Sequence, residues 1–362
     1  MIKVLVVDDS ALVRKLLSQV FAAEGDFETQ LARDGREALD KLTSFQPDVI
    51  TLDIHMPLMD GLACLDRIMV ERPCPVVMVS SLTAEGADIT LEALRLGAVD
   101  FVAKPTGAVS LRMHEVAPEL VQKVRSAAGV RLRSSARLRE RVQHRIGSAT
   151  QARQERTPVR STVASRPVEA RSGEGLVLVG TSTGGPSALE ALLTALPAEF
   201  PWPILVAQHM PASFTDALAR RLDKICALTV TEVAKPTLVE AGSVYIGRGD
   251  ADIIVSRRAA GLIAMPAPSE AGYPWHPSTD RLVRTAMQQL SPSQIIGVLM
   301  TGMGDDGAGA MTQLHEAGGR TIAEDETTAV VWGMPGELVK AGGADHILPM
   351  HEIAGHLQAM VS

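Results

Sequence analysis

Short apolar runs alternate with stretches of helical periodicity through the first third of the chain. SALVRKLLSQVFA and DGREALDKL repeat apolar residues every three or four positions, which is the pattern of one helix face. The apolar runs are VLVV at 4–7, VITL at 49–52, VVMV at 76–79 and DFVA at 100–103. This alternation predicts an α/β fold in which helices cover both faces of a parallel, doubly wound sheet.

The same alternation returns near residue 175. Three strongly apolar segments, LVLVG, PILVAQ and IIGVLM, each run directly into a loop. After the first of them comes a glycine-rich turn and then a helix with Pro186 near its start. We therefore expect two doubly wound domains, at 1–125 and 175–362, the second with a Rossmann-like parallel sheet.

Charge divides the chain in the same way. Residues 1–125 carry 13 Lys and Arg against 19 Asp and Glu, and residues 175–362 carry 11 against 19. Between them, residues 126–174 carry 11 Arg against 4 Glu, with no Phe, Trp or Tyr. Such a segment cannot build a hydrophobic core, so we interpret it as an Arg-rich linker. A solvated tether is the favoured interpretation, and a patch for nucleic acid or an anionic membrane is the alternative.

The composition also bears on partners and compartment. Both predicted domains are acidic, which argues against nucleic acid as a partner because a polyphosphate is repelled. No apolar stretch approaches the roughly 18 residues of a membrane span, and the first residues turn acidic too soon for a secretory signal. We therefore expect a cytoplasmic protein. Cys64, Cys74 and Cys226 lack metal-ligand spacing, which favours reduced thiols over a disulfide or a zinc site.

Polar side chains stand directly after the apolar runs of the first domain. Asp8 and Asp9 follow the first run and Asp53 follows the second. Ser80 follows the third and Lys104 the fourth. Because ligands bind beyond the carboxyl ends of parallel strands, we expect these side chains to converge. Three carboxylates in one place repel each other unless a cation lies among them, and their oxygens suit Mg²⁺.

Such a site suits phosphoryl chemistry. A carboxylate beside Mg²⁺ can attack a phosphoryl donor and give an acyl phosphate. The metal and a lysine then neutralise its charge, while a serine hydroxyl donates to its oxygens. The alternative is that DDS caps a helix and Lys104 is an ordinary surface charge. That alternative explains each residue alone, but not all five at strand ends.

The motifs VLVVDDS, LDIHMPLMDG, VMVSS and FVAKP resemble those of two-component response-regulator receiver domains, which have a flavodoxin-like fold. The resemblance covers residues 1 to about 125 and implies Asp53 as the phosphoacceptor. The metal ligands that it implies are Asp8, Asp9, Asp53 and the backbone carbonyl of His55. The switch residues that it implies are Ser80, Phe101 and Lys104. His55 stands where related receivers commonly carry an acidic residue.

A glycine-rich turn, GTSTGGP, opens the second domain. Gly184 and Gly185 allow backbone conformations that a Cβ blocks, and the following helix directs unpaired N–H groups toward the turn. Ser182 therefore lies where a developing anion is stabilised, which makes it a candidate nucleophile. A phosphate-binding turn and a plain serine N-cap are the alternatives. No GxGxxG or GxxxxGK[ST] spacing supports a nucleotide site.

A nucleophilic serine needs a base. Among the nine histidines only His209 ends a strongly apolar strand, and His276 in YPWHPSTD is the reserve candidate. A carboxylate is expected on another strand-end loop, where TGMGDDG offers Asp305 and Asp306. Spacing alone does not decide between these two. The three strand ends together predict a serine–histidine–aspartate triad.

Together with PSTDRL and TIAEDETTAVVWGMPGEL, these motifs resemble the catalytic domain of the chemotaxis protein-glutamate methylesterases over residues 175 to about 358. The triad that the resemblance implies is Ser182 as nucleophile, His209 as general base and Asp306 as the residue that orients the imidazole. It places oxyanion-stabilising groups at Thr183 and Met303. Thr181 and Glu324 depart from the Ala and Gln that are usual in the family.

The resemblance implies hydrolysis of glutamate methyl esters on chemoreceptors, with glutamine deamidation as a second activity. It implies Mg²⁺ in the receiver domain and no cofactor for ester hydrolysis. A chemotaxis histidine kinase would phosphorylate Asp53 and so weaken the interface by which the receiver covers the active site, and the protein would meet the membrane only through receptors. The rival functions are a hydrolase for another signalling protein and a phosphorylation-gated adaptor without turnover. A transcriptional role lacks a helix-turn-helix pattern.

Overall fold

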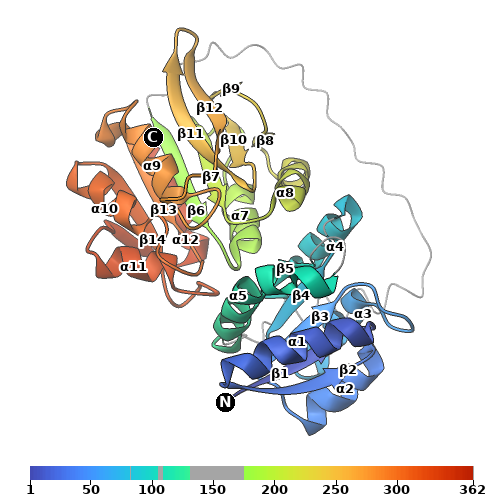
Figure 1. Ribbon diagram of the computed structural model, residues 1–362. Helices are drawn as coiled ribbons and strands as arrows, with labels where there is room; N and C mark the ends of the chain where they lie inside the picture. Colours follow the sequence, from blue (N-terminus) through green and yellow to red (C-terminus); the bar gives the residue numbers. More distant parts are fainter. Residues whose placement is uncertain (82, 105–108, 131–174, 362) are drawn as a thin grey trace.

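The structure, a computed structural model, describes residues 1–81, 83–104, 109–130 and 175–361. These residues form two α/β units that lie side by side (Figure 1). Most of the predicted linker, residues 131–174, lies outside the described residues, so the tether stays a prediction.

The first unit contains a five-stranded parallel sheet in the order β2-β1-β3-β4-β5. Its strands are β1 (Ile2–Val7), β2 (Phe27–Ala32), β3 (Val49–Asp53), β4 (Val76–Ser80) and β5 (Asp100–Ala103). Its helices are α1 (Ala11–Glu24), α2 (Gly35–Ser44), α3 (Gly61–Glu71), α4 (Ala84–Arg95) and α5 (Val109–Ala128). The predicted doubly wound sheet is confirmed. The hydrophobic pattern did not single out β2, because this edge strand, FETQLA, mixes polar and apolar residues.

The winding of this sheet reverses between β1 and β3, and ligands of doubly wound sheets bind beyond the carboxyl ends of the strands at such a point. Side-chain caps fix where the helices leave those loops. The oxygens of Ser10 and Asp60 accept backbone N–H groups at the starts of α1 and α3. Asp8 and Asp53 are therefore held at the same edge of the sheet.

The second unit contains a seven-stranded sheet in the order β15-β14-β13-β6-β7-β10-β8, and all six strand pairs are parallel. The strands are β6 (Leu176–Thr181), β7 (Ile204–Gln208), β8 (Thr229–Val233), β10 (Ser243–Gly247), β13 (Ile295–Leu299), β14 (Arg320–Glu324) and β15 (His346–Leu348). The parallel sheet confirms the expected fold class. Its winding reverses between β6 and β13, which are the strands that lead to Ser182 and to the TGMGDDG loop.

An antiparallel sheet in the order β11-β12-β9 accompanies the parallel one and was not predicted. Its strands are β9 (Thr237–Leu238), β11 (Ala251–Arg258) and β12 (Gly261–Pro268). Both long strands are only partly buried, so the continuous apolar run that marks a buried parallel strand is missing.

The helices of the second unit cover its sheet. They are α7 (Gly185–Thr194), α8 (Ala212–Ile225), α9 (Thr279–Met287), η1 (Pro292–Gln294), α10 (Ala308–Glu316), α11 (Met334–Lys340) and α12 (Met350–Val361). Among the described residues, no helix combines the length and the apolar character that a membrane crossing requires.

The two units touch through α4 and β5 of the first and α7 and α8 of the second (Figure 1). Phe101 of β5 packs against Phe214 of α8, with ring centroids 4.4 Å apart. Arg221 forms an ion pair across the contact with Glu92, at 3.5 Å. The contact therefore includes the aromatic residue that directly follows Asp100 in the first unit.

Candidate active site

The acidic pocket of the first unit forms where β1 and β3 end. Asp8, Asp9 and Asp53 each direct a carboxylate oxygen to within 4.8 Å of the others. Lys104, just after β5, lies 2.8 Å from Oδ1 of Asp53 and 2.9 Å from Oδ2 of Asp8. The structure thus brings together the three acids and the lysine that the sequence pattern singled out.

The electrostatics of this pocket follow from its burial. Burial raises the pKa of Asp8, because it disfavours the charged carboxylate, and the ammonium of Lys104 works against that rise. Burial alone would lower the pKa of Lys104. The nearby carboxylates of Asp53 and Asp8 outweigh this effect, so the pKa of Lys104 is raised. Asp8 and Asp53 are buried while Asp9 is exposed, so protein oxygens and water can share one cation. This donor set fits Mg²⁺.

The other candidate residues of the first unit contact different parts of the structure. The hydroxyl of Ser80 bonds toward α4, donating to the carbonyl of Gly86 at 3.3 Å and accepting from Thr90 at 2.7 Å. Phe101 is buried in the contact with the second unit. The side chain of His55 is exposed. Ser80 therefore bonds to α4 and Phe101 packs against α8, two helices that meet where the units touch.

In the second unit, the three candidate triad residues lie on loops at the ends of neighbouring strands. Thr181 and Gln208 are paired in the register of β6 and β7, so Ser182 and His209 follow at adjacent ends. The N–H of His209 donates to the carbonyl of Thr181 at 3.0 Å. The N–H of Ser182 donates to the carbonyl of Thr301, also at 3.0 Å, which joins the third loop to the first.

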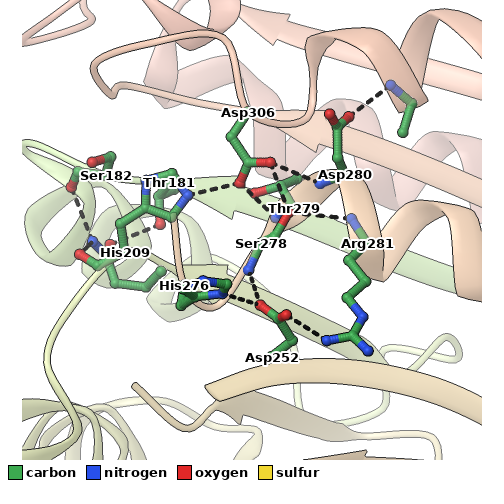
Figure 2. Close-up of polar contacts among 12 residues, drawn as sticks. Thr181, Ser182, His209, Asp252, His276, Ser278, Thr279, Asp280, Arg281 and Asp306 are labelled. Atoms are coloured by element: carbon green, nitrogen blue, oxygen red, sulfur yellow. Dashed lines mark hydrogen bonds and ion pairs between the residues drawn. The ribbon is translucent and has the colours of Figure 1, made fainter. Parts of the chain in front are cut away.

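His209 and Asp306 form a direct contact (Figure 2). Nε2 of His209 lies 2.8 Å from Oδ2 of Asp306. The other ring nitrogen, Nδ1, is buried and has no hydrogen-bond partner among the described residues. Because a carboxylate can only accept, we assign the proton of the neutral ring to Nε2, which leaves the lone pair of Nδ1 free. Ser182 is 8% exposed, so most of this residue is buried.

Asp306 is held by the start of α9. Oδ2 accepts from the N–H of Thr279 at 2.6 Å, and Oδ1 accepts from the hydroxyl of Ser278 at 2.9 Å and the N–H of Asp280 at 3.1 Å (Figure 2). Burial acts to raise the pKa of Asp306, but the hydrogen bond and charge of His209 and these N–H groups outweigh it and lower the pKa. The carboxylate therefore stays charged beside the imidazole. Asp305 is exposed.

The role of Ser278 and Thr279 could not be foreseen from sequence spacing. In the sequence, their segment PSTDRL served only as one of the motifs that carry the family resemblance. A serine before a helical stretch is a recognisable N-cap signal, and Ser278 does cap α9 by accepting from the N–H of Arg281. That the same helix start would bind Asp306 requires the tertiary structure.

A buried amide holds the glycine-rich turn in place. The carbonyl oxygen of Gln208 accepts from the hydroxyl of Thr181 at 2.7 Å, and its amide nitrogen donates to the carbonyls of Ser182 and His209 at 3.0 Å each. A Cβ on Gly185 would lie 1.9 Å from Oε1, the side-chain oxygen of Gln208. Thr181, which stands where alanine is usual in the family, therefore contributes a hydrogen bond that helps to hold the turn.

The two residues that the resemblance assigns to the oxyanion site are both buried. Thr183 directs its hydroxyl to Oδ2 of Asp100, which belongs to the first unit. The backbone carbonyl of Thr183 accepts from the hydroxyl of Thr301 at 2.8 Å. Met303 lies in the loop that also carries Asp306. The residue next to Ser182 therefore contacts the first unit directly.

The reserve candidate His276 has a different partner. Its Nδ1 lies 2.9 Å from Oδ1 of Asp252, which also accepts from the N–H of Ser278 at 2.7 Å (Figure 2). Oδ2 of Asp252 accepts from the guanidinium of Arg281 at 2.6 Å. This ring is therefore engaged with a second buried carboxylate and does not share the one that binds His209.

Comparisons with known proteins agree over both units. Family models match at residues 4–114, described as a response regulator receiver domain, and at 177–357, described as CheB methylesterase. Protein-glutamate methylesterase/protein-glutamine glutaminase 2 of Rhodopseudomonas palustris is 56% identical over 354 residues, covering 98% of this chain and 96% of that relative. The corresponding protein 3 of Rhodospirillum rubrum is 52% identical over 362 residues, covering 100% and 97%.

A solved structure agrees with the second unit. The crystal structure of the Thermotoga maritima CheB methylesterase catalytic domain is 37% identical, with a TM-score of 0.50. The match covers 51% of this chain and 98% of the Thermotoga chain. Both resemblances found in the sequence are confirmed.

Proposed function

Since this chain belongs to the CheB methylesterase family and begins with a response regulator receiver domain, we propose that it hydrolyses methyl esters of glutamate side chains on chemoreceptors. Deamidation of selected receptor glutamines is its second activity. The observation that carries the proposal is the buried His209–Asp306 pair, which leaves Nδ1 of His209 unpartnered among the described residues at the strand end next to Ser182.

In the proposed reaction, Nδ1 of His209 takes the proton of the Ser182 hydroxyl as its oxygen attacks the ester carbonyl. The tetrahedral intermediate collapses when the imidazolium returns that proton to the departing methoxide, which leaves as methanol. A water molecule then attacks the glutamyl-enzyme, again with His209 as base, and frees the glutamate and Ser182. Asp306 stabilises the imidazolium in both halves of the reaction and holds its tautomer.

The oxyanion falls near the glycine-rich turn. We assign its stabilisation to the backbone at Thr183 and Met303, two buried positions on the loops that flank Ser182. Preorganised N–H donors of this kind contribute on the order of 10²- to 10³-fold in rate, because they face charge that exists only in the transition state. The same residues serve deamidation, in which ammonia replaces methanol as the leaving group.

The receiver gates this site in the proposed mechanism. Asp53 accepts a phosphoryl group from a chemotaxis histidine kinase, and Asp8, Asp9, Asp53 and the carbonyl of His55 would hold the Mg²⁺ that neutralises phosphoryl charge when bound. Lys104 pairs with the new phosphoryl oxygens. A contact between the units supports this gating. The carboxylate of Asp100, in the receiver, accepts a hydrogen bond from the hydroxyl of Thr183, the residue after Ser182. Phosphorylation then shifts a docking equilibrium between the two units.

Methanol release from methylated receptor membranes tests the proposal. We expect Ser182→Ala to lower the rate on the order of 10⁶-fold, because a triad without its nucleophile loses most of its advantage over water. Phosphorylation of Asp53 by acetyl phosphate should be unaffected in this variant, which is the control for folding of the first unit. Methanol release at the normal rate by Ser182→Ala would refute the assignment, and absence of release by the unmodified protein with phosphodonor would favour the non-catalytic adaptor.

A further inference from the structure

The imidazole of His209 has a neighbour besides Asp306. The indole of Trp275 stacks on it, with ring centroids 6.0 Å apart and planes inclined by only 6°. This spacing is typical of offset-stacked rings, which are favoured over a face-to-face arrangement. Trp275 comes from the segment between β12 and α9, which is not one of the three loops that carry the proposed triad.

The indole also rests on the loop that carries Asp306. A Cβ on Gly304 would lie 2.7 Å from Cζ2 of Trp275, so only glycine leaves room for the ring. Gly304 also has a φ of +79°, a conformation that L side chains rarely adopt. Trp275 further borders a groove of about 680 Å³, which Asp305 and Asp306 line as well.

The segment that carries Trp275 is anchored at its C-terminal side. Asp252, which is fully buried, binds the ring of His276 and the N–H of Ser278 with one oxygen. Its other oxygen binds Arg281 of α9. These contacts give His276 a structural role, because they fix the residue directly after Trp275 in the chain.

From this geometry we propose that Trp275 is a positioning residue for the general base of the proposed esterase. Its indole keeps the His209 ring in the orientation in which Nε2 meets Asp306 and Nδ1 stays free. The electron-rich face of the indole also favours the positive charge that the imidazole acquires in each half-reaction. The inference rests on the proposed function, since His209 acts as a base only if the triad is correct.

Two substitutions at position 275 distinguish the effect of an aromatic ring from the effect of side-chain volume. Trp275→Phe keeps an aromatic face, whereas Trp275→Leu fills part of the space without one. With the full-length protein and phosphodonor, we expect Trp275→Leu to lower kcat about fivefold with little change in KM, and Trp275→Phe to stay within about twofold. Trp202→Leu makes the same change beside Gly175, at the amino-terminal edge of the sheet, and should leave kcat unchanged.

A spectroscopic measurement adds a readout besides activity. The proton between Nε2 of His209 and Asp306 should give a downfield NMR resonance, assigned by its loss in His209→Gln. We expect the resonance to persist in Trp275→Phe and to broaden or vanish in Trp275→Leu. A sharp resonance with unchanged kcat in Trp275→Leu would overturn the inference.

The same measurements separate this inference from the proposed function. If Ser182→Ala keeps releasing methanol, the triad fails, while the NMR comparison still decides whether Trp275 orients His209. His276→Gln should lower kcat by less than about tenfold, because it only loosens the anchored segment. A loss as complete as that in His209→Gln would make His276 a base in its own right and overturn the anchoring argument.

Discussion

At the residue scale, Glu324 is the clearest departure from the family pattern. It is 1% exposed, and one of its carboxylate oxygens accepts from the N–H of Thr301 at 2.8 Å while the other accepts from the hydroxyl of Thr328 at 3.0 Å. Burial raises the pKa of Glu324, although both hydrogen bonds oppose the rise. The carboxyl therefore binds the same residue, Thr301, whose carbonyl accepts from Ser182, in surroundings that favour its neutral form.

This burial predicts a pH-dependent difference between the natural protein and Glu324→Gln. An acid whose pKa is raised by folding contributes stability below its ordinary pKa, near 4.5, and that contribution is lost as pH rises through the folded value. Glutamine can accept from Thr301 and donate to Thr328 without this loss. We expect Glu324→Gln to have the higher melting temperature at about pH 8, with the difference shrinking toward about pH 4. A difference that grows toward acid pH would contradict this account.

Individual residues also mark the limit of what the sequence could predict. The pattern placed Asp305 and Asp306 in one loop, but nothing in it distinguished a carboxylate that points to solvent from one that points to His209. Their different exposure depends on α9, which donates N–H groups to Asp306. The strand-end pattern predicted a position for Ser80 but not its partners, because Gly86 and Thr90, which bond to its hydroxyl, belong to α4.

At the element scale, the start of α7 depends on close contact with β7. Gly185 is the first residue of this helix, and the side chain of Gln208 occupies the space where a Cβ would project. The same amide holds the carbonyls of Ser182 and His209. The spacing of the helix start and the strand end is therefore coupled to the geometry of the candidate triad.

A matched pair of alanine substitutions tests this coupling. Gly185→Ala should displace Gln208 and cost roughly 1–3 kcal/mol of unfolding free energy, as overpacking does, together with most of the esterase activity. Gly355→Ala, at an exposed position of α12 with nothing within 4 Å, should stabilise the protein by roughly 0.5–1 kcal/mol and leave activity intact. Chemical denaturation and methanol release provide the two measurements. Normal activity in Gly185→Ala would show that the turn tolerates the shift.

Elements differed in how well their patterns foretold them. Fully buried strands such as β6 and β13 were visible as apolar runs, because both faces of a parallel sheet are covered. The antiparallel pair β11 and β12 was not, because its strands are partly exposed and lack such runs. Trp275 lies in the loop that follows this pair. Because this loop has no hydrophobic periodicity, the sequence did not predict that Trp275 stacks on His209.

At the scale of the whole molecule, the contact between the units links two sites that the sequence could only place separately. Asp100 accepts a hydrogen bond from Thr183 and pairs with Lys123 at 3.3 Å. Phe101, the next residue, packs on Phe214. A change in the receiver that moves β5 therefore acts directly on the turn that carries Ser182.

Substitutions at this contact test the gating mechanism. Asp100→Ala removes the acceptor for Thr183, and a lost hydrogen bond to a charged group should raise the esterase rate without phosphodonor roughly tenfold by weakening the docked state. Arg221→Ala, which removes the ion pair with Glu92, should act in the same direction but less, since that pair is partly exposed. Asp40→Ala removes an exposed acid from α2 and is the control, with no expected effect.

Stimulation by acetyl phosphate with Mg²⁺ completes the gating test. In Asp100→Ala the phosphodonor should add little, because the units are already separated, whereas Asp53→Asn should keep the basal rate and lose all stimulation. The two variants thus reach opposite ends of one docking equilibrium. If Asp100→Ala and Arg221→Ala both keep the low basal rate and full stimulation, the contact does not restrain the enzyme, and phosphorylation would have to act by a route other than undocking.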